Sequence, residues 1–164
     1  MKNKILIFGD SHSLYFRKTL DLNELMPILK DIDVTLEKLN GATIKGFGNR
    51  KSTLNTLDIF LENIRKNSPN VIVFGLGQVD VELGFYYRKI IKRDTTNFED
   101  FCNKLIENYL SSVKAVLSKI NFAGLIVFKG INNTTLTINQ QKAILYTKRI
   151  ITENVKEAKE IDKF

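Results

Sequence analysis

The chain has 164 residues, 43% of them hydrophobic, which suits one domain with an apolar core. One cysteine, Cys102, excludes an internal disulfide, and one histidine, His12, excludes a zinc site built from cysteine and histidine ligands. No apolar run approaches the about 18 to 20 residues that a membrane span requires, and residues 5–8 are too few for a signal peptide. We therefore expect one cytoplasmic domain over residues 1–164, with no cofactor or metal.

Positive charge exceeds negative charge, with 25 lysine and arginine residues against 18 acidic residues. The densest basic stretch, residues 88–93, directly follows an aromatic run at residues 85–87. Basic side chains beside aromatic rings can bind an anionic sugar polymer, so Tyr87 and Arg88 are candidate substrate-binding residues. A solvated basic surface explains the same pattern, and we do not expect a nucleic-acid partner. Charge leaves the oligomeric state open.

Short apolar runs rich in β-branched residues alternate along the chain with segments of helical periodicity. The expected strands are residues 4–8, a less clear strand within residues 34–47, residues 71–74 and residues 125–128. The expected helices are residues 54–64, residues 98–120 and residues 137–158. Ser52 is the expected N-cap of the first helix, and Thr96 with Glu99 forms the expected capping box of the second. Residues 81–95 are expected to be a loop that borders the binding cleft.

Strands that alternate with helices of this length indicate a parallel sheet, because parallel neighbours need a long crossover. We therefore expect an α/β fold, a three-layer α/β/α sandwich with a flavodoxin-like, mostly parallel sheet. Ligands of such sheets bind beyond the carboxyl ends of the strands. Three segments follow expected strands directly: residues 9–13, residues 40–48 and residues 77–80. They bring a hydroxyl group, glycine backbone that a ligand can approach closely, and a carboxylate to one edge.

The order of these segments resembles the sequence blocks of the SGNH/GDSL hydrolase superfamily. Gly9-Asp10-Ser11 closes the first strand, glycines follow the second, and Gly77-Gln78-Val79-Asp80 follows the third. The variant Gly-Asp-Ser-His-Ser is similar to a sub-group found in polysaccharide and cell-surface gene contexts. The resemblance covers residues 4–80 by motif, and the remainder only by alternation of elements. It implies hydrolysis of an ester, or acyl transfer, on a small molecule or polysaccharide.

The resemblance also implies roles for individual residues. Ser11, in the triplet with Asp10, would be the nucleophile, and its N–H group would hold the oxyanion together with the N–H group of Gly41 or Gly46. The spacing does not decide between these two glycines. Val79 occupies the position of the family's oxyanion asparagine, so that donor is missing unless Gln78 supplies an amide. Asp80 would be structural, accepting N–H bonds around residues 9–11.

The chain departs from the family in its base. The family carries an Asp-x-x-His block after the last strand, and this sequence has no histidine other than His12. Side chains of neighbouring residues diverge, so His12 is a poor base for Ser11 and is expected at the rim of the substrate site. Either the domain is truncated at its C-terminus, or the fold persists without the full chemistry. The alternative function is therefore a non-catalytic module that binds an anionic glycan or a protein partner.

Overall fold

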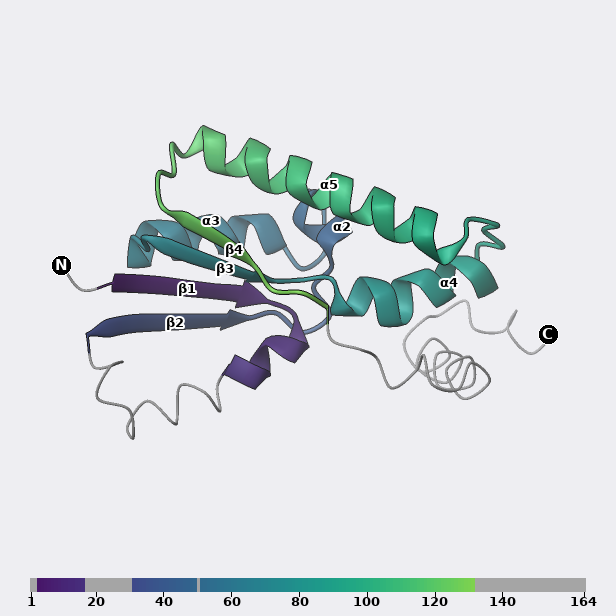
Figure 1. Cartoon of the computed structure of the whole chain (residues 1–164), viewed down its shortest axis with the longest axis horizontal. Helices are drawn as coiled ribbons and strands as arrows, with labels where there is room; N and C mark the ends of the chain where they lie inside the picture. Colours follow the sequence, from purple (N-terminus) through teal and green to yellow (C-terminus); the bar gives the residue numbers. More distant parts are fainter. Residues whose placement is uncertain (1–2, 17–30, 50, 132–164) are drawn as a thin grey trace.

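A four-stranded parallel sheet organises the part of the chain that the computed structural model describes, residues 3–16, 31–49 and 51–131. The strands are β1 (Asn3–Gly9), β2 (Ile32–Lys38), β3 (Val71–Gly75) and β4 (Leu125–Phe128). The helices are η1 (Ser11–Leu14), α2 (Ile44–Phe47), α3 (Thr56–Asn67), η4 (Asp80–Gly84), α4 (Phe85–Ile90) and α5 (Phe98–Lys119). Figure 1 shows α3 and α5 on the same face of the sheet.

The strand order is β2-β1-β3-β4, and every neighbouring pair is parallel. This is the order in which a flavodoxin-like sheet begins, and it confirms the expected α/β sandwich. The register pairs Gly9 at the end of β1 with Lys38 of β2 and Gly75 of β3. All three strands therefore end at the same level, and the segments that follow them share one edge of the sheet.

Aromatic side chains fill the core between the sheet and its helices. Phe8 and Phe74, from the two central strands, have no solvent exposure and pack on Phe60 of α3, with ring centroids 5.0 and 5.3 Å away. Phe47 of α2 lies 5.3 Å from Phe60, and Tyr109 of α5 lies 6.0 Å from Phe74. Each fully buried ring contributes roughly 2–3 kcal/mol by leaving water. This cluster fixes α2 and α5 against the sheet beside its carboxyl edge.

The second strand and both expected caps are placed differently from the sequence prediction. β2 begins at Ile32, two residues before the predicted range, and ends at Lys38, before the glycine-rich segment, as predicted. The N-cap of α3 is Asn55, because the Ser52 carbonyl accepts the Asn55 N–H in a turn that precedes the helix. The cap of α5 is one residue later than expected. Asn97 accepts the Asp100 N–H at 2.8 Å, whereas the Thr96 hydroxyl donates to Asp94.

Of residues 81–95, which the sequence predicted as a loop, residues 81–90 are helical and only residues 91–95 are a loop. The chain is helical from Gln78 to Ile90, with the π-helical turn η4 in its first half. There the Phe85 N–H donates to the Asp80 carbonyl, five residues back. A π turn inserts one residue into the helical repeat, so apolar positions on either side fall out of phase and the usual periodicity is lost. This segment borders a cavity, which is described below, whereas the prediction placed it beside the cleft of the serine segment.

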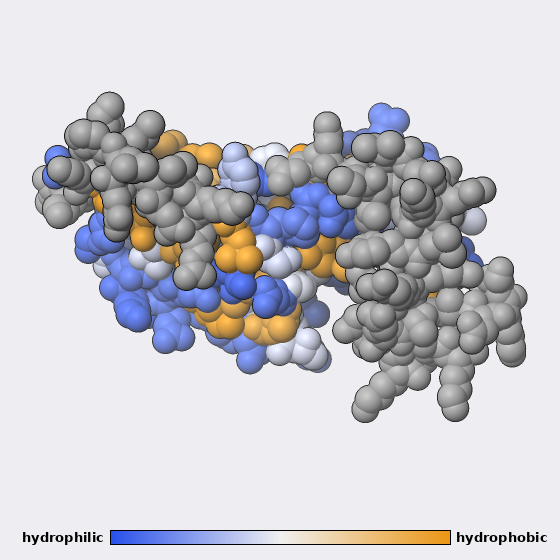
Figure 2. Space-filling view, turned by 90° about the horizontal axis from the view of Figure 1, so that it is seen from below, coloured by the Kyte–Doolittle hydropathy of each residue, from blue (hydrophilic) through white to orange (hydrophobic). Residues whose placement is uncertain are grey.

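The helix predicted over residues 137–158 lies outside the described residues. None of the helices in the described part of the chain combines the length and apolar character that a membrane span needs. Figure 2 shows the face seen from below in Figure 1, where hydrophobic patches on the described surface are interrupted by hydrophilic ones.

Candidate functional site at the carboxyl edge of the sheet

The segments after β1, β2 and β3 meet at one edge, as the strand order requires. Their backbones are joined directly. The Leu39 N–H, just after β2, donates to the Gly9 carbonyl at 2.9 Å, and the Asp10 N–H donates to the Gly75 carbonyl at 3.3 Å. These bonds extend the sheet pairing by one residue, so Ser11 begins its helical turn directly above the central strands.

Two glycines make room for the turn that carries Ser11. A Cβ atom on Gly9 would lie 1.9 Å from the Ser13 Oγ and 2.7 Å from the Gly75 carbonyl oxygen. A Cβ atom on Gly75 would lie 2.9 Å from the same Oγ. Real Cβ atoms do not approach backbone atoms as closely as at Gly9, so only glycine fits there, whereas a Cβ atom at position 75 would require the Ser13 hydroxyl to move. Ser13 is itself buried, and η1 can therefore pack down onto the strand ends.

Asp10 anchors the turn from below. Its side chain has no solvent exposure, and its Oδ1 accepts the His12 N–H at 2.9 Å as the N-cap of η1. The same oxygen lies 3.3 Å from the His12 Nδ1. The Ser11 side chain is half-buried, and its hydroxyl has no hydrogen-bond partner among the described residues. Asp10 thus holds the backbone of the serine turn, and His12 faces Asp10 and not Ser11.

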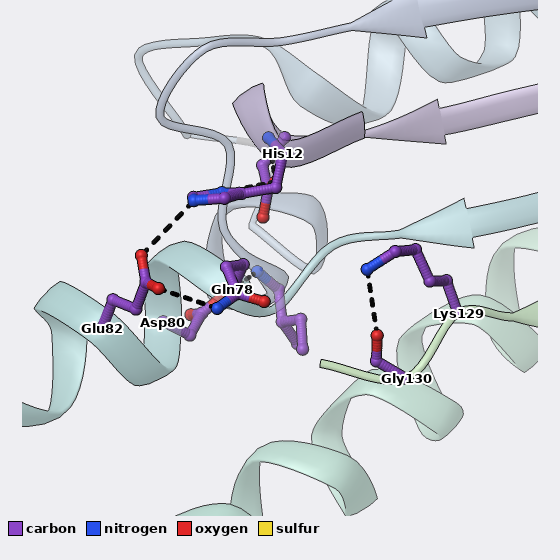
Figure 3. Close-up of polar contacts among 8 residues, drawn as sticks. His12, Gln78, Asp80, Glu82, Lys129 and Gly130 are labelled. Atoms are coloured by element: carbon purple, nitrogen blue, oxygen red, sulfur yellow. Dashed lines mark hydrogen bonds and ion pairs between the residues drawn. The ribbon is translucent and has the colours of Figure 1, made fainter. Parts of the chain in front are cut away.

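The other ring nitrogen of His12 faces Glu82 of η4. The His12 Nε2 lies 3.4 Å from the Glu82 Oε2, and the Gln78 Nε2 donates to the Glu82 Oε1 at 2.8 Å. Figure 3 shows the three side chains joined in this order, with Glu82 between the other two. Glu82 was not among the predicted site residues, because a loop was expected there. On a helix, Gln78 and Glu82 are four residues apart and share a face, which is the signal that would have found the pair.

The two glycines that the sequence could not separate differ in their hydrogen bonding. The Gly46 N–H, inside α2, donates to the Thr43 Oγ1 at 2.8 Å. Gly41 lies in the turn after β2 with a φ of 75°, and its N–H has no hydrogen-bond partner in the described part of the chain. A left-handed φ favours glycine. Of the two, Gly41 is the one whose N–H is available to a ligand.

Asp80 fastens the segment after β2 to the segment after β3. Its Oδ2 accepts the Ile44 N–H at 2.7 Å, at the start of α2. Its structural role was predicted, but the predicted partners, the N–H groups around residues 9–11, were wrong. Asp80 is 5% exposed, and this burial raises the pKa of its carboxyl from 3.8 to about 6, partly opposed by the Ile44 and Lys45 N–H groups and reinforced by the charge of Asp10.

A cavity of about 890 Å³ opens on the other side of Asp80, between α2, α4 and α5. Tyr87 and Arg88, the predicted substrate-binding residues, line it, whereas Ser11 and His12 do not. The predicted site residues therefore fall into two groups. Ser11, Asp10, His12 and Gln78 lie at the serine turn, and Tyr87 and Arg88 lie in the cavity, with Asp80 between the groups.

The described residues contain no group of three or more histidine, cysteine, aspartate or glutamate side chains that could hold a metal ion. Comparison of the sequence with protein-family models finds no match, and comparison with curated proteins finds none either. Among solved structures, the chain is similar to the crystal structure of TesA at 13% sequence identity and a TM-score of 0.49. That match covers 92% of this chain and 73% of TesA.

Proposed function

We propose that this chain carries the nucleophile edge of an SGNH/GDSL-type ester hydrolase or acyl transferase, with Ser11 as the nucleophile. The substrate would be an ester on a carbohydrate-like molecule. The observation that carries the proposal is the hydrogen bond from the Ile44 N–H to the Asp80 Oδ2, at 2.7 Å. It joins the second and third motif segments at the edge where Ser11 begins its turn, which supports the interpretation of the three segments as one site.

In the proposed reaction the Ser11 Oγ attacks the ester carbonyl carbon, and its proton passes through water to the oxygen of the departing alcohol. The tetrahedral intermediate then expels the alcohol, and the acyl group stays on Ser11 until water or an acceptor hydroxyl removes it. The Ser11 and Gly41 N–H groups are the candidate oxyanion donors, and the unpaired state of the Gly41 N–H supports it over Gly46. Val79 supplies no third donor, and loss of one such donor costs about 3 kcal/mol in a well-studied protease.

The position of His12 favours a second candidate, a non-catalytic module that binds an anionic glycan or a protein. Both ring nitrogens of His12 face carboxylate oxygens, at 3.3 Å from Asp10 and 3.4 Å from Glu82. A base for Ser11 would need a free ring nitrogen directed at the serine oxygen. The chain contains no other histidine, so no imidazole accepts the Ser11 proton in the proposed reaction.

Acylation of Ser11 separates the two functions, because it is detectable even when deacylation is slow. The chain would be incubated with p-nitrophenyl acetate and digested, and the acetylated peptide would be located by mass spectrometry. We expect acetyl on the peptide that contains Ser11, and none at that position in Ser11→Ala. Acetylation of surface lysines alone, at equal rates in both proteins, would refute the nucleophile and leave the binding function.

A further inference from the structure

The cavity between α2, α4 and α5 is lined by basic side chains from three separate elements. Lys45 comes from α2, Arg88 from α4, Lys92 from the turn after α4, and Lys104 from α5. Figure 1 shows α4 running beside the N-terminal part of α5. The ring of Phe85 on α4 lies 5.1 Å from that of Phe98 on α5, which fixes the two helices together. The fold therefore gathers cations that are far apart in the sequence.

The carboxylates of this cavity are already engaged. Asp94 pairs with Arg88 at 2.6 Å and accepts hydrogen bonds from Thr96, and these contacts lower the pKa of its carboxyl to about 2. Asp80 is buried and accepts the Ile44 N–H. Lys45 and Lys104 have no acidic partner among the described residues. Two lysines of the cavity therefore have no acidic partner in the described part of the chain, because both carboxylates of the cavity already accept hydrogen bonds from other groups.

Neutral polar groups and rings complete the lining. Lys104, Asn108 and Ser112 are four residues apart in turn, so they share one face of α5, and all three line the cavity. Tyr87 lies opposite, with the Lys92 ammonium 5.7 Å from its ring centroid. A volume of about 890 Å³ is in the range that encloses a small ligand. Amide and hydroxyl groups can bind ligand hydroxyls, and a ring can pack against a flat ligand face.

We propose that this cavity binds a small hydroxylated anion, a sugar that carries a phosphate or a carboxylate group, with Lys45 and Lys104 as its main charge partners. Lys92 adds to the positive field, whereas Asp94 neutralises Arg88, and Asn108 and Ser112 bind the hydroxyl groups. The site is separate from Ser11 and does not depend on the proposed acyl chemistry. A polyanionic strand such as nucleic acid would extend along a groove, whereas these residues line a single hollow between three helices.

Calorimetric titration of the full chain tests the proposal with three probes that share one ring: glucose 6-phosphate, glucuronate and glucose. We expect at least one of the two anions to bind and glucose not to bind. The double variant Lys45→Glu/Lys104→Glu should weaken anion binding by about tenfold or more, and Lys45→Arg/Lys104→Arg should retain it. Raising the salt concentration should weaken binding in the wild type.

The matched control is Lys66→Glu/Lys114→Glu, which makes the same change in net charge at two exposed positions outside the cavity lining. It should bind within about twofold of the wild type, and so should Ser11→Ala. Melting curves would show that each variant is folded. A short oligothymidylate is titrated as well, as a nucleic-acid probe. The proposal is wrong if neither sugar anion binds, if glucose binds as tightly as the anions, or if the oligothymidylate alone binds. It is also wrong if the two charge-reversal variants weaken binding equally. Because binding does not require Ser11, this outcome is independent of the acylation experiment.

Discussion

The Asp80 carboxylate accepts the Ile44 N–H at 2.7 Å, between residues 36 apart in the sequence. The bond places a buried carboxylate at the first turn of α2, where the helix has unpaired N–H groups. It joins the glycine turn after β2 to the helical segment after β3. Asp80 lies between the serine turn and the cavity that α2, α4 and α5 line. Both proposed sites therefore depend on one buried acid.

Asp80 should make stability fall as the pH rises from about 4 to about 6. Its pKa in the folded chain is about 6, above the value of 3.8 that an unfolded chain gives. The folded state thus binds more protons in that window, and its advantage is lost as the carboxyl ionises. About two pKa units correspond to roughly 3 kcal/mol of unfolding free energy. Asp80→Asn keeps an acceptor oxygen for the Ile44 N–H and should lack this dependence.

Denaturant unfolding of both proteins at pH 4, 5, 6 and 7 measures the effect. The unfolding free energy of the wild type minus that of Asp80→Asn should decrease by roughly 2–2.5 kcal/mol between pH 4 and pH 7. Carboxyl groups that do not interact with Asp80 titrate equally in the two proteins, so the difference reports Asp80 together with its coupling to Asp10. A difference that stays constant over this range would show that burial does not raise the pKa of Asp80.

Gly9→Ala should destabilise the chain by roughly 2–4 kcal/mol, because its Cβ would meet the Ser13 Oγ at 1.9 Å and the Gly75 carbonyl oxygen at 2.7 Å. Adding Ser13→Ala should recover only part of the loss, since the backbone contact remains. Gly130→Ala is the control, because a Cβ there would have no neighbour within 4 Å, and it should change stability by less than about 0.5 kcal/mol. Equal effects of the two single substitutions in thermal melts would contradict the packing.

The two caps that differ from the sequence prediction can be compared directly. Asn97→Ala removes the acceptor for the Asp100 N–H and should cost about 1 kcal/mol. Ser52 caps no helix in the structure, so Ser52→Ala should stay within about 0.5 kcal/mol of the wild type. Urea unfolding resolves such differences. A loss for Ser52→Ala as large as that for Asn97→Ala would show that Ser52 caps α3, as the sequence predicted.

Turnover of p-nitrophenyl acetate should be far below that of a typical esterase, which is about 10 per second. Losing the base of a catalytic triad removes about 10⁴ to 10⁶ of the rate. Because His12 faces Asp10 and Glu82, His12→Asn should leave the small Ser11-dependent rate within about threefold, whereas Ser11→Ala should abolish it. A rate near 10 per second that His12→Asn removes would establish His12 as the base.

Local pattern alone was enough for the sheet and for the edge where the motif segments meet. Strands such as Asn3–Gly9 and Val71–Gly75 are short apolar runs that end in glycine, and hydrophobic burial follows directly from such runs. The alternation with helices then makes the strands parallel, and parallel strands end at a common edge. The sequence therefore determined that Ser11 and Asp80 lie at the carboxyl edge of one parallel sheet, and the structure shows that their strands are neighbours.

Tertiary structure decided what each of those residues contacts. Gly41 and Gly46 are equivalent by spacing, and only the folded chain pairs the Gly46 N–H with Thr43. Glu82 was hidden because the π turn breaks the helical period, and Lys45 and Lys104 come together only when α2 packs beside α5. Periodicity indicates which face of an element is buried, because burial depends on the polarity of each residue along that element. Hydrogen bonds and charge clusters join residues from different elements, so the packing of those elements determines them.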